Sequence, residues 1–128
     1  AEPLFWQTDL SGRSVGGCCL SASLRDYARV GLFALEGGEG IVPEGWFAEA
    51  GAPQVDFGNG YGYGYQWWTY PGESFGAQGI FGQSITLLPD TDTVIAIVSN
   101  WPRATGQDLS ANRRQLFAAI AEAVSADQ

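Results

Sequence analysis

The first periodic stretch of the chain has apolar residues at helical spacing. They recur every three or four positions between Ser21 and Gly37, which puts them on one face of a helix. These positions are Leu24, Tyr27, Ala28, Gly31, Leu32 and Leu35. The hydroxyl of Ser21 can cap the first turn, and Gly37-Gly38 can end the helix in a left-handed conformation. A second, short helix is predicted to begin at Pro43, because proline suits the first position of a helix.

The aromatic run at residues 61–70 changes the pattern to that of a strand. Tyrosine and tryptophan favour strands, where wide side chains pack across a pleated surface. Successive residues of a strand point to opposite faces, so Tyr63, Tyr65 and Trp67 should share one face. Gln66 and Trp68 should then lie on the other face.

Two further strands and a helix complete the pattern. Turn residues at 70–73 and 89–92 bound a strand predicted over residues 75–88. Residues 94–98 are apolar at every position, which is typical of a central strand covered on both faces. A terminal helix from Ser110 should cover it with an apolar stripe. The stripe consists of Leu116, Phe117, Ile120, Ala121 and Val124.

The predicted fold class is therefore α+β, with an antiparallel sheet of three strands in this chain packed against helices. At 128 residues the chain is one domain or part of one. Three strands are few for a stable sheet, and the apolar third strand indicates that further strands and helices cover it.

Composition narrows the possible functions. Six arginines and no lysine stand against fourteen acidic residues, giving a net charge of −8. We therefore expect neither nucleic acid nor a membrane as partner, because phosphate binding requires clustered cations and no apolar run reaches about 18 residues. No signal peptide is recognised at the start of the chain, and the localisation stays open between a bacterial cytoplasm and periplasm.

The missing residue types exclude several catalytic sites within the chain itself. Without histidine there is no Ser-His-Asp triad, no cysteine–histidine pair and no histidine-based metal site. Without lysine there is no lysine-activated serine. The two cysteines, Cys18 and Cys19, are adjacent, and we expect them to be unpaired and buried, because neighbouring cysteines rarely form a disulfide. No cofactor and no metal are expected.

One catalytic element needs no particular side chain. A glycine-flanked strand start can offer backbone amides to a developing oxyanion, and Gly79-Ile80 fits that role. The alternative is structural, with Gly76, Gly79 and Gly82 marking a bulge or twist in the strand.

Several segments, in order, resemble the β-lactamase-related serine hydrolases. This family includes class C β-lactamases, family VIII esterases and 6-aminohexanoate-dimer hydrolases. The matching segments are GGCCLSASLRDYARVG at 16–31, YGYGYQWW at 61–68, GIFGQS at 79–84, LPD at 88–90 and VIAIVSN at 94–100. Each segment alone is a modest match to the family, but together the segments cover nearly the whole chain. Within the family, the aminohexanoate-dimer hydrolase and esterase branch is the most similar.

The resemblance implies a role for this chain in a larger enzyme. The family's Ser-x-x-Lys motif and its tyrosine motif would lie upstream, so residues 1–128 would be the C-terminal part of a single β-lactamase-like domain. The substrate would be a small-molecule amide or ester, and the missing part would be the N-terminal part of the same protein or a second chain.

The resemblance also implies site residues. The family's Lys-Thr-Gly position would fall on Ala77-Gln78-Gly79, with residues 75–77 as the alternative register, and Ala77 and Gln78 would contact substrate. The backbone amide of Ile80 would donate to the oxyanion. Gly17 and Cys18 would lie on a loop near the cleft.

A different class of function rests on the aromatic residues. Tyr61, Tyr63, Trp67 and Trp68 could form a platform on which a sugar or peptide stacks, in a noncatalytic binding module. The structural alternative is that most of them belong to the core.

Overall fold

The computed structural model describes residues 2–126 and has two antiparallel sheets and three α-helices. The strands are β1 (Phe5–Trp6), β2 (Leu20–Ser21), β3 (Val55–Gly58), β4 (Tyr61–Tyr63), β5 (Trp68–Thr69), β6 (Phe75–Gln78), β7 (Ser84–Leu88) and β8 (Thr93–Ile97). The helices are α1 (Leu24–Leu35), α2 (Trp46–Ala50) and α3 (Gln107–Ala126), with 3-10 turns η1 (Ile80–Gly82) and η2 (Pro89–Thr91). The α+β class is confirmed.

The number of strands differs from the prediction. The main sheet has six strands in the order β3-β4-β5-β6-β7-β8, and β1 pairs with β2 in a separate two-stranded sheet. Every neighbour in the main sheet is also the next strand along the chain, so the sheet is a continuous antiparallel meander. The prediction of three strands was wrong because two of the expected strands are hairpins and because β3 was not predicted.

The aromatic run makes the first of these hairpins. Strands β4 and β5 are joined by a turn in which Gln66 has a positive φ of 66°. Tyr63 is therefore paired with Trp68 across the hairpin, and their rings meet edge to face at 5.2 Å. The expected grouping of Tyr63 with Trp67 on one face is thus wrong.

The second hairpin replaces the strand expected over residues 75–88. Strands β6 and β7 pair from Phe75 with Leu87 to Gln78 with Ser84. The residues between them reverse the chain through η1, where Phe81 has a φ of 64°. Residues 79–83 therefore form a turn at the end of the sheet, which is called the 79–83 turn below.

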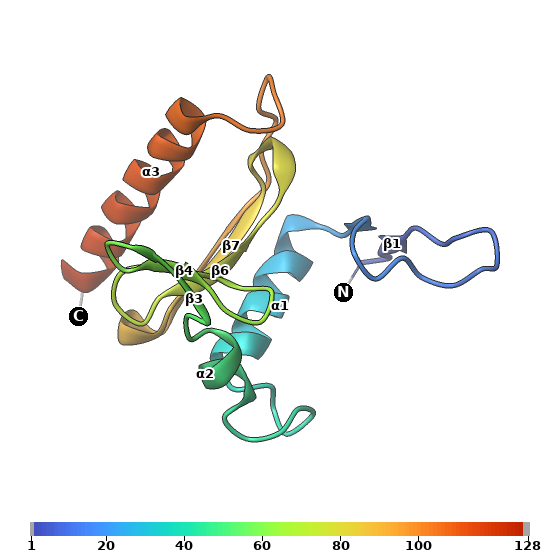
Figure 1. The fold of residues 1–128 in the computed structure, drawn as a ribbon, viewed down its shortest axis with the longest axis horizontal. Coiled ribbons are helices and arrows are strands. Elements are labelled where there is room, and N and C mark those ends of the chain that lie inside the picture. Colours follow the sequence, from blue (N-terminus) through green and yellow to red (C-terminus); the bar gives the residue numbers. More distant parts are fainter. Residues whose placement is uncertain (1, 127–128) are drawn as a thin grey trace.

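Helix α1 lies on one face of the sheet, and α3 lies on the other (Figure 1). Ala34 of α1 belongs to the core cluster, whose other buried members are Phe75, Ile85 and Leu87. A Cβ added at Gly31 would lie 2.5 Å from Cγ1 of Val94, so α1 packs closely on β8. Among the described residues β8 is an edge strand covered by α1, which corrects the expectation of a central strand covered by the last helix.

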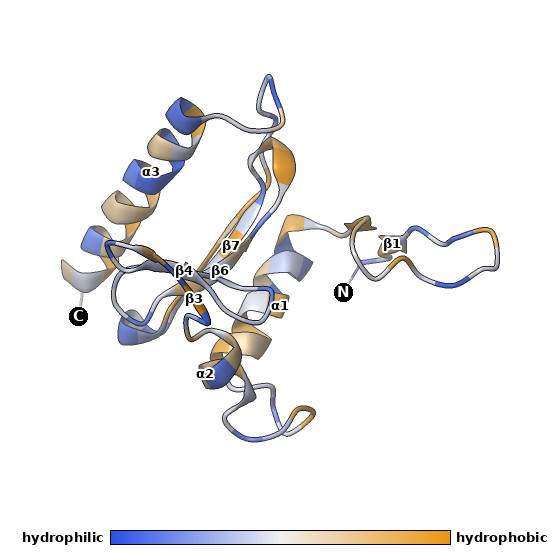
Figure 2. Ribbon diagram, viewed as in Figure 1, coloured by the Kyte–Doolittle hydropathy of each residue, from blue (hydrophilic) through white to orange (hydrophobic). Residues whose placement is uncertain are grey.

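The terminal helix has few contacts with the sheet. None of the described residues of α3 is buried, although hydrophilic and hydrophobic bands alternate along it (Figure 2). The helix begins at Gln107, before the expected Ser110. No helix among residues 2–126 has the length and apolarity required to cross a membrane.

The helix starts predicted near the N-terminus are shifted. The N-cap of α1 is Ser23, whose Oγ accepts from the amide of Asp26 at 3.3 Å, while Ser21 lies in β2 opposite Phe5. Helix α2 begins at Trp46 after Gly45, because Pro43 is used in the turn before it.

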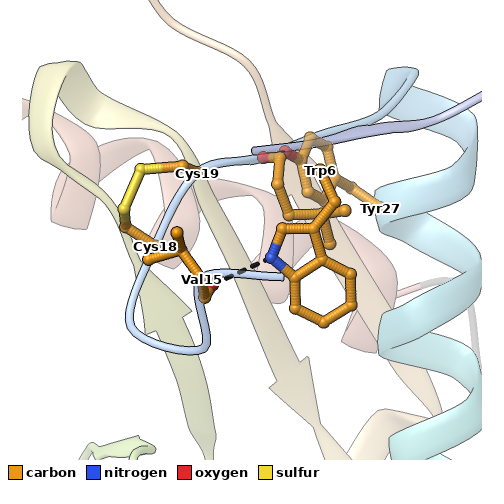
Figure 3. Close-up of a disulfide and its surroundings, with 6 residues drawn as sticks. Trp6, Val15, Cys18, Cys19 and Tyr27 are labelled. Atoms are coloured by element: carbon orange, nitrogen blue, oxygen red, sulfur yellow. Dashed lines mark hydrogen bonds between the residues drawn. A yellow bond between two sulfur atoms is a disulfide. The ribbon is translucent and has the colours of Figure 1, made fainter. Parts of the chain in front are cut away.

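The two cysteines are bonded to each other, which contradicts the expectation of free, buried thiols (Figure 3). Cys19 has a φ of 75°, a backbone conformation that brings the two neighbouring side chains together. Both cysteines are exposed, in the loop that leads into β2. In the same loop region, the indole of Trp6 donates to the carbonyl of Val15 at 2.9 Å.

Candidate active site

The residues predicted to act on the oxyanion lie in the 79–83 turn, where β6 ends. Within the turn, the amide of Gly79 donates to the carbonyl of Gln83 at 2.9 Å. Gly79 has extended backbone angles, φ −106° and ψ 164°, and Ile80 starts the 3-10 turn that follows. The turn is solvent-exposed at Gly79, and 59% of the Ile80 residue surface is accessible.

The amide of Ile80 is free. Within residues 2–126 its neighbours Gly79 and Phe81 both donate to carbonyls, whereas the Ile80 amide has no hydrogen-bond partner. An unpaired amide on a tight turn can donate to a developing negative charge without first giving up a bond within the protein. The arrangement is thus compatible with one donor of an oxyanion hole.

A segment before α3 holds the turn from outside. The amide of Phe81 donates to the carbonyl of Ala104 at 2.9 Å, and the amide of Trp101 donates to the carbonyl of Phe81 at 3.3 Å. Gly82 lies against the indole, because a Cβ there would be 2.3 Å from Cε2 of Trp101. Phe81 is thereby fixed in a left-handed conformation that bulky residues rarely adopt.

Gln78 and Ala77 precede the turn in β6 and point to opposite faces of the sheet. Ala77 is paired with Ile85, on the face of the core cluster. Gln78 is half-buried on the α3 face, where its Nε2 donates to the hydroxyl of Tyr70 at 2.7 Å and its Oε1 accepts from Nη2 of Arg113. Both ends of the Gln78 side chain are therefore engaged within the chain.

Arg113 is central to a small polar network. Its guanidinium also lies 5.1 Å from the centre of the Trp101 ring, within the range of a cation–π contact. Burial lowers the pKa of Arg113, but a guanidinium remains charged at neutral pH. Burial also raises the pKa of the Tyr70 phenol, and the hydrogen bond with Gln78 opposes that rise.

The other two predicted site residues lie elsewhere in the chain. Gly17 and Cys18 are in the exposed loop before β2, and a Cβ at Gly17 would meet nothing within 4 Å. Among the described residues no hydrogen bond joins this loop to the 79–83 turn. The structure thus groups Ala77, Gln78, Gly79 and Ile80, and it does not add Gly17 or Cys18 to them.

Arg113, Trp101 and Phe81 were not predicted from the sequence. Arg113 does carry a recognisable pattern, because it lies four residues before Phe117 and so shares the face of α3 that carries the apolar stripe. A charged residue on such a face needs a partner. Nothing in the sequence marks Phe81, since phenylalanine has no preference for a positive φ.

The aromatic residues divide between the core and a cavity. Trp67 packs edge to face on Phe75 with ring centres 5.3 Å apart, and it borders the core cluster. Tyr61 and Trp68 are partly exposed and line a cavity of about 380 Å³ between the sheet and α3, together with Arg113. No group of three or more histidine, cysteine or acidic side chains among residues 2–126 could hold a metal ion.

Comparison with known proteins identifies the family. The model of the beta-lactamase family matches residues 3–120. The 6-aminohexanoate-dimer hydrolase of Paenarthrobacter ureafaciens is 32% identical over 110 residues, which cover 73% of this chain and 28% of that protein. This chain thus matches little more than a quarter of that relative, and the match nevertheless covers most of the chain itself. The chain therefore belongs to the beta-lactamase-related family of serine hydrolases.

Proposed function

We propose that this chain is the C-terminal part of a serine hydrolase that cleaves a small-molecule amide or ester through an acyl-enzyme. Residues 1–128 would form one portion of a single β-lactamase-like domain. The nucleophilic serine and its lysine would come from the N-terminal part of the same protein or from a second chain, because this chain has no lysine and no histidine. Alone, the chain should be catalytically silent.

The observation that carries the proposal is the amide of Ile80, which has no hydrogen-bond partner among residues 2–126 and belongs to an exposed residue of the 79–83 turn. When a serine oxygen attacks the substrate carbonyl, its proton passes to a base and the carbonyl electrons move onto oxygen. The N–H of Ile80 would donate to that oxygen at about 2.7–3.1 Å. Collapse of the intermediate would expel the amine or alcohol, which takes up the proton.

The exposed apolar surface supports the idea that more protein covers this chain. Few hydrophobic side chains are buried, and Leu87 is the largest fully buried one among the described residues. In the part of the chain that the structure describes, helix α3 has no buried residue and one edge of β8 is unpaired. Such surfaces are unusual on a protein that is complete by itself.

The proposed substrate-binding roles of Ala77, Gln78, Gly17 and Cys18 rest on different observations. Ala77 lies two residues before Gly79 in β6, and this position near the 79–83 turn supports a place beside the substrate, although its side chain is on the face of the core cluster. Gln78 is engaged with Tyr70 and Arg113, which favours a supporting role over direct contact. Gly17 and Cys18 depend on the family resemblance alone.

The backbone of the turn allows a sharp test. Proline at position 80 would remove the amide hydrogen, and the extended angles of Gly79 suit a residue that precedes proline. In the complete protein, Ile80→Pro should lower kcat for a p-nitrophenyl ester by about 10²–10³-fold, the usual effect of losing one oxyanion donor. Ile80→Val, which keeps the amide, is the matched control.

Two results would contradict the proposal. One is an Ile80→Pro protein as active as Ile80→Val. The other is ester turnover by the isolated chain above that of its Gly79→Pro variant, because the chain alone should lack a nucleophile. The coding sequence upstream of Ala1 gives an independent check, since it should encode Ser-x-x-Lys.

A second candidate function is the binding of a sugar or peptide by a noncatalytic module. It is favoured by the partly exposed Tyr61 and Trp68, which line the cavity beside α3. Titration with oligosaccharides would shift and quench tryptophan fluorescence if this module binds sugars. Trp68→Ala should then abolish the change, whereas Trp67→Leu should destabilise the core instead.

A further inference from the structure

The 79–83 turn holds Phe81 in an unfavourable backbone conformation, and residues outside the turn bond to it there. Phe81 is in the left-handed region, a strained conformation for a bulky residue that persists only when surrounding contacts impose it. The amide of Phe81 donates to Ala104 and its carbonyl accepts from Trp101, so both backbone polar groups of Phe81 are bonded to residues outside the turn. The conformation of Phe81, which fixes the direction of the neighbouring amides, must therefore be imposed by other elements.

The segment before α3 and helix α3 itself meet at the side chain of Trp101. Trp101 provides the surface on which Gly82 lies, and its amide holds the carbonyl of Phe81. Arg113 lies over the ring of Trp101 and donates to Gln78, the last residue of β6 before the turn. One guanidinium thus contacts both the residue that precedes the turn and the indole that supports its far end.

The planar guanidinium suits this position. Arginine can stack on an aromatic face while its edge donates hydrogen bonds, whereas the ammonium of lysine is a point charge without that geometry. Gln78 is fixed at its other end by the hydroxyl of Tyr70. The link from α3 to the turn therefore runs through groups that have little freedom to rotate.

We infer that Arg113 is a positioning residue that holds the amide of Ile80 in place by fixing Gln78 on one side of the turn and Trp101 on the other. Arg113 has no direct contact with the Ile80 amide, and it acts through the backbone of the turn. The catalytic meaning of the inference rests on the proposed function. The physical link between Arg113 and the 79–83 turn does not rest on the proposed function, because it follows from the contacts of Arg113 alone.

The test combines hydrogen exchange with kinetics on the complete protein. In Arg113→Gln, the amide of Phe81 should exchange at least about tenfold faster, because the turn opens more often. The same variant should lower kcat by about 10–100-fold with KM nearly unchanged, since misplacing a catalytic group by about 1 Å can cost that much. Arg113→Lys should recover only part of kcat.

Arg114→Gln is the matched control. It removes the same charge from the next position of α3, where the arginine is exposed, and it should change neither exchange nor kcat. Arg113→Lys also guards against misfolding, because it keeps the charge and most of the apolar stem. If both Arg113 variants leave Phe81 exchange at the wild-type rate, the inference is overturned.

The remaining outcomes separate the inference from the proposed function. Faster exchange with wild-type kcat overturns the positioning role in catalysis. Faster exchange in a protein whose wild type hydrolyses neither esters nor amides supports the physical link between Arg113 and the 79–83 turn and refutes the proposed function. Faster exchange together with a lower kcat and constant KM supports both.

Discussion

The backbone of Gly64 lies directly on the carbonyl oxygen of Ala50. A Cβ added at Gly64 would be 2.1 Å from that oxygen, and the amide of Tyr65 donates to the same oxygen at 2.9 Å. Ala50 is completely buried. The end of α2 therefore contacts the β4–β5 hairpin through backbone atoms. A backbone carbonyl cannot move aside for an added group in the way that a flexible side chain can.

Gly64→Ala should destabilise the protein by about 1–3 kcal/mol, the usual cost of forcing an extra group into a packed site. Denaturant unfolding followed by tryptophan fluorescence measures the change. Gly16→Ala is the matched control, because a Cβ at Gly16 would meet nothing within 4 Å. Equal midpoints for the two variants would show that the close approach at Gly64 is not needed for folding.

The disulfide between Cys18 and Cys19 should contribute almost nothing to stability. A disulfide stabilises mainly by shortening the loops of the unfolded chain, and here no residue lies between the two cysteines. Reduction with dithiothreitol should therefore change the free energy of unfolding by less than about 1 kcal/mol, against about 2–4 kcal/mol for a typical disulfide. Alkylation before and after reduction measures the bond itself, and two labels should appear only after reduction. Labelling without reduction would show that the thiols are free.

Much of the fold could be predicted because helical period and turn residues are local features. Helix α1, helix α3 and the turn between β7 and β8 follow directly from such patterns. The α+β class also followed. Gly79 and Ile80, expected at the start of a strand, lie instead in the turn after β6, and their catalytic role stays a prediction. What failed was the division of the sheet into strands.

Three of the failures have one physical cause. The hairpin in the aromatic run, the hairpin over residues 75–88 and the cysteine pair each contain a residue other than glycine with positive φ. These residues are Gln66, Phe81 and Cys19. None of the three favours that conformation by itself, so tertiary contacts impose it and the sequence offers no local pattern. The hydrogen bond between Arg113 and Gln78 was not predicted for a related reason, because the two residues are 35 positions apart in the sequence.

Helix α1 should not tolerate a larger residue at Gly31. A Cβ there would be 2.5 Å from Val94 and 2.8 Å from Ile85, so a leucine would push α1 away from β7 and β8. Gly31→Leu should lower the free energy of unfolding by about 1–3 kcal/mol despite the better helix propensity of leucine. Val30→Leu enlarges an exposed neighbour on the same helix and should leave stability nearly unchanged. A Gly31→Leu protein as stable as Val30→Leu would mean that α1 does not pack on β8 as described.

Asp26 should give α1 a pH-dependent contribution to stability. Hydrogen bonds from the Glu2 amide, from Arg29 and from Ser23 lower the pKa of its carboxyl to about 2. Because the folded pKa lies below the unfolded value of about 3.9, the ionised carboxylate stabilises the fold fully above about pH 4. That stabilisation should disappear as the pH falls towards 2.

The measurement compares Asp26→Asn with the wild type by urea unfolding between pH 7 and pH 2. The variant should be less stable at pH 7, and the difference should shrink between about pH 4 and pH 2, where the wild-type carboxylate becomes protonated. Asp90→Asn removes an equal charge from an exposed position and serves as the control for net charge. A stability difference between Asp26→Asn and the wild type that stays constant down to pH 2 would show that the ionised form of Asp26 is not what stabilises the start of α1.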